Sequence, residues 1–258
     1  TLVHTEGICQ EIAALSGHVL APEVAEAFRA AAAREAFWIA LVPRHVQSYL
    51  ADLALPQWGV TIEFPQFRHV ARLVSSIVDA KSHFTAAHSL GVAQLSRHLG
   101  ERMGFGPEAL SKMEIAGLMH DIGKLCVPDE IVEKPARLTS AEFSVMERHS
   151  FETYQILRHV PGLETIAEWA AFHHEALNGQ GYPFRRTAAD LTTEARIVAV
   201  ADVFQALAQA RPYRGPQALE EISRLLEEFA SKGVLDADIV AVARDDLDSS
   251  WRAATQTH

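Results

Sequence analysis

The sequence predicts an all-α fold, a bundle of helices preceded by a small helical segment. Apolar residues recur at steps of three and four along most of the chain, as they do on one face of an α-helix. Alternation of apolar and polar residues, which would indicate half-buried strands, is rare. Glycine and proline gather between the periodic stretches, at 104–107, 161–162, 179–183 and 212–216, where we expect loops.

The first region, 1–60, is predicted to be a helical lead-in, with an alanine-rich stretch over 7–54. Pro56, Gly59 and Pro65 interrupt the helical period before the main region, 61–258. Residues 16–29 match 231–244 without gaps. The lead-in is therefore either the tail of a degenerate or regulatory domain or an unrelated amphipathic segment. The chain starts at Thr1 rather than Met, so we expect an upstream domain to be missing.

The main region contains several predicted helices, each with an apolar stripe that we expect to face a core. The stripes comprise Val70, Leu73, Val74, Ile77 and Val78; His88, Val92, Leu95 and Leu99; and Ile115, Leu118, Met119 and Ile122. Thr139 and Glu142 have the spacing of a capping box that opens the helix carrying Phe143 and Met146. Asp236 is the predicted N-cap of a helix over 239–243.

Composition limits the classes of function. The chain has 258 residues, 48% hydrophobic and 22% charged, which is typical of a globular protein. Its formal net charge of −10 disfavours general binding of polymeric nucleic acid, although a local cationic pocket remains open. Only Cys9 and Cys126 are present, which fits a reducing compartment, and we expect a cytoplasmic location with Cys126 as a small buried residue. No signal peptide is visible, and no apolar stretch is long enough for membrane insertion.

Histidine is unusually frequent, with thirteen in the chain. Seven metal-ligand residues are spaced so that successive helices could return them to one level of a bundle, as in dinuclear helix-bundle sites. Imidazoles with carboxylates favour iron, manganese or zinc over magnesium or calcium. The candidate ligands are His88, His120, Asp121, His149, His173, His174 and Asp202.

The neighbouring motifs make this pattern specific. His-Asp at 120–121 is followed by Ile-Gly-Lys at 122–124, and His-His-Glu at 173–175 leads to Asn-Gly-Gln-Gly-Tyr-Pro at 178–183. Ala-Asp at 201–202 and Arg-Pro-Tyr-Arg at 211–214 complete the series. In this order, from about 77 to 245, the chain resembles the HD-GYP family, a branch of the HD-domain metal-dependent phosphohydrolases. The resemblance implies an HD-domain helical bundle.

The resemblance also implies an activity. Members typically hydrolyse the bacterial second messenger cyclic di-GMP to pGpG, GMP or both. Carried over, two divalent metal ions, iron or manganese first, would hold a hydroxide that attacks phosphorus. Asp121 would bridge the two ions. The first ion would also be held by His88, His120 and Asp202, and the second by His149, His173 and His174.

Three cations are candidates for phosphate contact. Lys124 follows Asp121 by three residues, and if the helix continues it lies near the same face and could neutralise a phosphate oxygen in the transition state. Arg211 and Arg214 suit bidentate phosphate recognition. Solvated surface positions are the alternative for all three.

The loop with Gly181, Tyr182 and Pro183 should border the site because it directly follows two predicted ligands. It could fix His173 and His174 in place or contact the substrate. It also resembles surfaces proposed in the family to dock diguanylate cyclase domains, so such a domain is a possible partner.

The sequence departs from the family pattern in several places. Asp79 replaces a frequent Glu and Ser82 a frequent Asp. Phe84 stands where members with a third metal carry Glu, so we predict two metals. His83 has a poor spacing to substitute as a third-metal ligand. Gln205 stands where many members have Asp.

Two other functions remain open at this level. The chain could hydrolyse another cyclic nucleotide or nucleoside phosphate, although the Gly-Tyr-Pro loop argues against this. It could also be a cyclic di-GMP receptor or docking module without turnover, although degenerate members usually lose ligands. A substrate panel and a metal analysis separate the three.

Overall fold

The computed structural model describes residues 5–34, 37–38, 62–81, 88–209 and 215–255. The chain divides into two compact units, Thr1–Thr61 and Ile62–His258. In the first unit, the described helices are α1 (Thr5–Leu15) and α2 (Pro22–Ala32). Edge-to-face contacts of Phe28, Phe37 and Trp38 add a small aromatic cluster to this unit.

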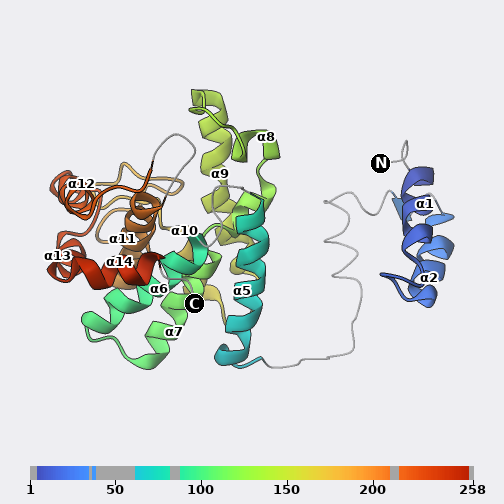
Figure 1. Ribbon diagram of the computed structural model, residues 1–258, viewed down its shortest axis with the longest axis horizontal. Helices are drawn as coiled ribbons and strands as arrows, with labels where there is room; N and C mark the ends of the chain where they lie inside the picture. Colours follow the sequence, from blue (N-terminus) through green and yellow to red (C-terminus); the bar gives the residue numbers. More distant parts are fainter. Residues whose placement is uncertain (1–4, 35–36, 39–61, 82–87, 210–214, 256–258) are drawn as a thin grey trace. The chain divides into compact units, whose positions relative to one another are not determined.

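The regular elements in the described part of the second unit are all helices, which confirms the all-α prediction. Its helices, shown in Figure 1, are α5 (Phe64–Ala80), α6 (His88–Arg102), α7 (Pro107–Met119), the 3₁₀ helix η1 (Ile122–Cys126), α8 (Asp129–Val132), α9 (Ser140–Leu157), α10 (Glu164–Ala171), α11 (Thr193–Ala208), α12 (Leu219–Ser231), α13 (Ala237–Asp245) and α14 (Leu247–Thr255). α12, α13 and α14 gather at one end of this unit, whereas α5 and α9 lie at the other (Figure 1). No helix in the described ranges has the length and apolar character needed to cross a bilayer.

Helix ends follow the predicted capping signals. The Thr139 side chain accepts a hydrogen bond from the Glu142 amide, and the Glu142 carboxylate accepts one from the Thr139 amide, so the predicted capping box opens α9. Asp236 accepts from the amides of Asp238 and Ile239 at the start of α13. Both caps satisfy backbone donors that a helix start leaves unpaired.

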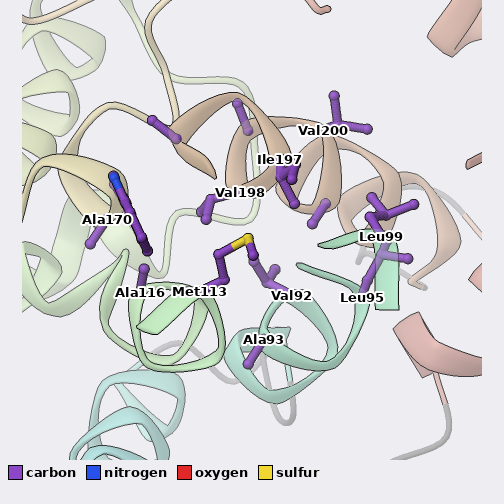
Figure 2. Close-up of a cluster of buried hydrophobic side chains, with 14 of the residues drawn as sticks. Val92, Ala93, Leu95, Leu99, Met113, Ala116, Ala170, Ile197, Val198 and Val200 are labelled. Atoms are coloured by element: carbon purple, nitrogen blue, oxygen red, sulfur yellow. The ribbon is translucent and has the colours of Figure 1, made fainter. Parts of the chain in front are cut away.

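The core of the second unit lies where α6, α7, α10 and α11 meet. Figure 2 shows side chains of these helices gathered around Met113 of α7. α6 and α7 make the most extensive contact in the unit. A Cβ atom on Gly117 of α7 would lie 2.6 Å from the Cα of Ala93, so glycine is required for the two helices to approach this closely. This pair of helices carries two of the candidate ligands, His88 and His120, at its ends.

Two expectations about burial are wrong. In the predicted stripe of α5 only Val74 and Val78 turn inward, whereas Val70, Leu73 and Ile77 are exposed. The two sets lie on adjacent faces, and apolar character alone does not separate them. Cys126, expected to be buried, is exposed at the end of η1.

Candidate metal centre

The seven predicted ligands come from five segments of the second unit. His88 is the first residue of α6, and His120 and Asp121 stand at the junction between α7 and η1. His149 lies in α9, the His173–His174 pair follows α10, and Asp202 lies in α11. The structure brings their ligand atoms together in two clusters, His88 with His120 and Asp202, and His149 with His173 and His174. A third group, His120 with Asp121 and His173, links the two.

The first cluster joins α6, α7 and α11. Nε2 of His88 lies 3.2 Å from Nε2 of His120 and 3.3 Å from Oδ1 of Asp202. Nε2 of His120 lies 3.2 Å from Oδ2 of Asp121. All four residues are buried. The cluster therefore presents two imidazole nitrogens and two carboxylates to one point.

The second cluster joins α9 to the segment after α10. Nε2 of His149 lies 3.2 Å from Nε2 of His173, and 3.4 Å from Oδ1 of Asp121. The His174 ring lies 4.0 Å from that of His173 and 5.1 Å from that of His149, measured between centroids. Its ligand atom falls with those of His149 and His173 within 4.8 Å of one another. His174 is the partly exposed member, so this cluster is the one nearer the surface.

Asp121 lies between the clusters and faces each with a different oxygen. Its Oδ2 is directed at His120 and His88, whereas its Oδ1 is directed at His149 and His173. A carboxylate placed in this way can share its two oxygens between two cations. The two clusters contain the residues that the resemblance assigned to each ion, but His120 and His173, from different clusters, also group with Asp121. The assignment of ligands to ions, and the ions themselves, stay a prediction.

The hydrogen bonds of the histidine rings fix which nitrogen is free. His120, His149 and His173 each donate from Nδ1 to a backbone carbonyl three residues earlier, those of Gly117, Met146 and Ala170. His88 has its Nδ1 against Oε1 of Gln205 instead. With Nδ1 occupied as the donor, Nε2 is the nitrogen that each ring directs at the centre of its cluster, and it presents a lone pair there when the ring is unprotonated.

Lone pairs and carboxylate oxygens facing one another at these distances repel unless a positive charge lies between them. The pKa of His120 reflects the negative charge of the cluster. Burial alone would lower this pKa, but the charges of Asp121 and Asp202 raise it to about 9. Burial also opposes ionisation of Asp121, yet His120 and Lys124 hold the pKa of that carboxyl well below its usual range. The donor set therefore fits divalent cations that accept both nitrogen and oxygen ligands.

The three imidazoles of the second cluster are kept neutral. Burial lowers the pKa of His149 and, together with the neighbouring histidines, that of His173. Burial likewise lowers the pKa of His174 to about 3. Metal ligation needs the unprotonated ring, so these three histidines are in the required state at neutral pH.

Comparison with known proteins identifies the family. A model of the HD domain matches residues 72–239. The chain belongs to the HD-domain family. This confirms the family membership that the His-Asp and Gly-Tyr-Pro motifs predicted. The matched range of the HD domain includes all seven candidate ligands.

Several relatives are similar over much of the chain. It is 36% identical over 236 residues, 91% of its length, to the 3′3′-cGAMP-specific phosphodiesterase 1 of Vibrio cholerae, and covers 55% of that relative. It is 36% identical over 165 residues, 63% of its length, to a cyclic di-GMP phosphodiesterase of Thermotoga maritima, and covers 44% of it. The chain thus spans about half the length of these relatives.

A solved structure shares the fold. The structure of a cyclic GMP-AMP-specific phosphodiesterase of Vibrio cholerae aligns with a TM-score of 0.53 and 27% sequence identity. The alignment covers 94% of this chain and 56% of that one.

The α-helix does not continue through the His-Asp turn of the HD domain. α7 ends at Met119, and η1 begins after Asp121. Residues three apart stand almost above one another in a 3₁₀ helix, so Lys124 still reaches Asp121, with Nζ 2.5 Å from Oδ2. Lys124 therefore lies beside Asp121 as expected, although through a 3₁₀ turn and not through a continued α-helix.

Contacts with α9 hold this turn in place. The Thr153 hydroxyl donates to the His120 carbonyl and accepts from the Gly123 amide. A Cβ atom on Gly123 would lie only 1.9 Å from the carbonyl oxygen of His149, so glycine is required at this contact. The turn that carries two ligands thus rests directly on the helix that carries a third.

The Gly-Tyr-Pro loop lies beside the second cluster, as expected. The Tyr182 ring lies 4.9 Å from the His174 ring, and the Tyr182 amide donates to the His174 carbonyl. A Cβ atom on Gly181 would lie 2.3 Å from the Ala176 amide nitrogen, so only glycine fits there. Pro183 follows through a cis peptide bond.

Glu175 fixes the far side of the loop. Its buried carboxylate accepts hydrogen bonds from the amides of Phe184 and Arg186. The loop is thus held in place beside the site, with its tyrosine against His174. Whether it serves as a scaffold for the ligands or contacts the substrate stays a prediction. Docking of a diguanylate cyclase domain on this loop stays a prediction.

The sequence analysis did not identify three residues that hold the candidate ligands in position. Gln205, Thr153 and Glu175 each hold a ligand or a ligand-bearing segment by hydrogen bonds. Gln205 had the clearest available signal, since it stands three residues after Asp202 and departs from the family pattern. Thr153 and Glu175 had only their nearness to motif residues.

Several predictions fall outside the described residues. Arg211 and Arg214 lie there, and so do Ser82, His83 and Phe84. The arginine contacts and the choice of two metals over three stay predictions.

Proposed function

We propose that this HD domain is a metal-dependent phosphodiesterase that hydrolyses a guanine-containing cyclic dinucleotide. Cyclic di-GMP is the substrate that the motifs favour. The products would be pGpG, GMP or both. The single observation that carries the proposal is the pair of acceptor clusters joined by the two oxygens of Asp121.

The residues would hold two divalent ions, iron or manganese, in the division described above. His88, His120 and Asp202 would serve one ion, His149, His173 and His174 the other, and Asp121 both. Bound divalent ions lower the pKa of water and neutralise charge on phosphate oxygens, which is the chemistry that phosphodiester hydrolysis needs.

Lys124 is the cation of the described residues best placed to meet the substrate. Its ammonium lies against Asp121, and its side chain is about one-fifth exposed, so the lysine is both held in place and accessible. In this position it would stabilise negative charge that develops on a phosphate oxygen. Arg211 and Arg214 would contact the second phosphate, and Gly181, Tyr182 and Pro183 would form the adjoining wall.

A second candidate substrate is 3′3′-cGAMP. The relative that aligns over 91% of the chain is named as specific for it, whereas the cyclic di-GMP phosphodiesterase aligns over 63%. Both dinucleotides contain guanine and 3′–5′ linkages, so the same metal centre serves either. The choice depends on contacts to the bases.

A substrate panel with metal analysis tests the proposal. Protein purified without chelator, and supplied with iron or manganese under reducing conditions, is incubated with cyclic di-GMP, 3′3′-cGAMP and cyclic di-AMP. We expect about two metal ions per chain and hydrolysis of at least one guanine-containing substrate. The variant with both His120→Ala and Asp121→Ala should lose metal and activity while its circular dichroism stays helical.

Other outcomes decide between the alternatives. No hydrolysis of either guanine-containing dinucleotide by metal-loaded protein would overturn the proposal. Binding of nucleotide by metal-free protein without turnover would favour a receptor. Retained hydrolysis in the double variant would show that the centre lies elsewhere.

A further inference from the structure

An exposed aromatic ring is linked to the candidate metal centre through one other ring. Phe143 of α9 is 46% exposed, and its ring lies edge-on to Tyr182 at 6.1 Å between centroids. Tyr182 in turn lies against His174. The three rings form a path from the second cluster to the surface. A nucleotide with its phosphate at that cluster would extend its base along this path.

A carboxylate stands one helical turn from this ring. Glu147 follows Phe143 by four residues, so the two side chains share a face of α9. Glu147 is itself partly exposed on that face. No ion pair or side-chain hydrogen bond engages Glu147 within the described ranges, so its acceptor oxygens are available.

We propose that Phe143 and Glu147 bind a guanine base of the substrate, an inference that rests on the proposed function. Phe143 supplies a face on which a purine stacks, and base–aromatic stacking is insensitive to the identity of the base. Glu147 supplies the selectivity. A carboxylate accepts from the N1–H and N2–H groups of guanine, whereas the corresponding edge of adenine presents an acceptor at N1.

A purely structural role for Phe143 is the competing explanation. Phe143 is the fourth residue of α9, and Leu138 precedes the N-cap Thr139. Apolar residues at these two positions often pack together and stabilise a helix start. Phe143→Leu keeps an apolar side chain for that contact but removes the aromatic face. Phe143→Tyr keeps both.

Phe151 provides a matched control. It lies on the same helix, is 41% exposed and contacts another aromatic ring, that of Phe184. No ring contact joins it to Tyr182 or to a candidate ligand in the part of the chain that the structure describes. Phe151→Leu therefore removes an equivalent aromatic side chain away from the metal centre.

Steady-state kinetics with the metal-loaded chain test the stacking role. Phe143→Leu should raise the KM for cyclic di-GMP or 3′3′-cGAMP roughly 5- to 150-fold, the range of one lost stacking contact, with little change in kcat or metal content. Phe143→Tyr should keep the KM of the wild type, and so should Phe151→Leu. An unchanged KM in Phe143→Leu would overturn the role of this ring.

Glu147→Gln tests the choice of base. An amide can both donate and accept, so it fits the adenine edge better than a carboxylate does. The ratio of kcat/KM for cyclic di-GMP to that for cyclic di-AMP should fall about tenfold in this variant, and an unchanged ratio would refute the guanine assignment. If the wild type hydrolyses none of these dinucleotides, the proposed function itself fails, an outcome distinct from both.

Discussion

At the scale of single residues, His88 differs from the other candidate ligands in how its ring is held. His120, His149 and His173 each use a carbonyl of the preceding turn. His88 is the first residue of α6, and its ring is held from another helix. Gln205 of α11 supplies the acceptor instead. Gly91 makes room for it, because a Cβ atom there would lie 2.9 Å from Cγ of Gln205.

Replacement of Gln205 by leucine should weaken metal binding. The side chain keeps its approximate volume, but His88 loses the partner that fixes its orientation. Loss of such a partner typically lowers metal affinity 10- to 100-fold. Competition with a chelator measures the affinity. Gln205→Glu keeps an acceptor oxygen and should retain most of it. Equal affinity in Gln205→Leu and the wild type would show that His88 needs no such support.

The candidate ligands could be predicted from the sequence, whereas the residues that hold those ligands in place could not. The seven candidate ligands could be found from the sequence because their residue types are those that bind metals. Their spacing and their order along the chain also match one family motif. Gln205, Thr153 and Glu175 could not be assigned roles, because an amide, a hydroxyl or one more acid carries no pattern of its own. Their roles depend on which atoms of distant segments meet, and only the fold determines that.

At the scale of elements, the contact between α6 and α7 sets the first cluster. Helix positions here were predictable from apolar periodicity, but the closeness of the helices was not. It depends on Gly117, whose missing side chain admits the backbone of Ala93. The 3₁₀ turn of η1 was likewise unpredicted, since a spacing of three residues fits both helix types.

Two glycines in this contact give a matched test. A Cβ on Gly117 would meet backbone, whereas one on Gly100 would meet the mobile ends of Met113 and Leu110. Gly117→Ala should lower the free energy of unfolding by about 1–3 kcal/mol, the usual range for overpacking. Gly100→Ala should have a smaller effect, since those side-chain ends can shift and alanine favours the helix. Urea denaturation followed by circular dichroism measures both.

The same two glycine variants should also differ in how much metal they retain. A shift between α6 and α7 moves His88 relative to His120, so Gly117→Ala should retain less metal than Gly100→Ala. Equal stability of the two variants would show that the backbone of α6 can move away without cost.

At the scale of the whole molecule, the centre gathers five segments that are far apart in the sequence. His88 and His120 are 32 residues apart, and His88 and Gln205 are 117 apart. An unfolded chain cannot present these atoms together, so ions that bind the clusters bind the folded state almost alone. Buried Asp121 and Asp202, whose pKa values are held low, remain negatively charged and need the compensating charge.

Metal removal should therefore destabilise the protein measurably. A ligand present at about 100 times its Kd stabilises the folded state by about 2.7 kcal/mol. Calorimetry should show a lower Tm after chelation and recovery after manganese is added back. In the variant with both His120→Ala and Asp121→Ala, the same chelator should leave the Tm unchanged. A Tm shift of equal size in that variant would place the stabilising ion elsewhere, and no shift in the wild type would mean that the clusters bind no ion at all.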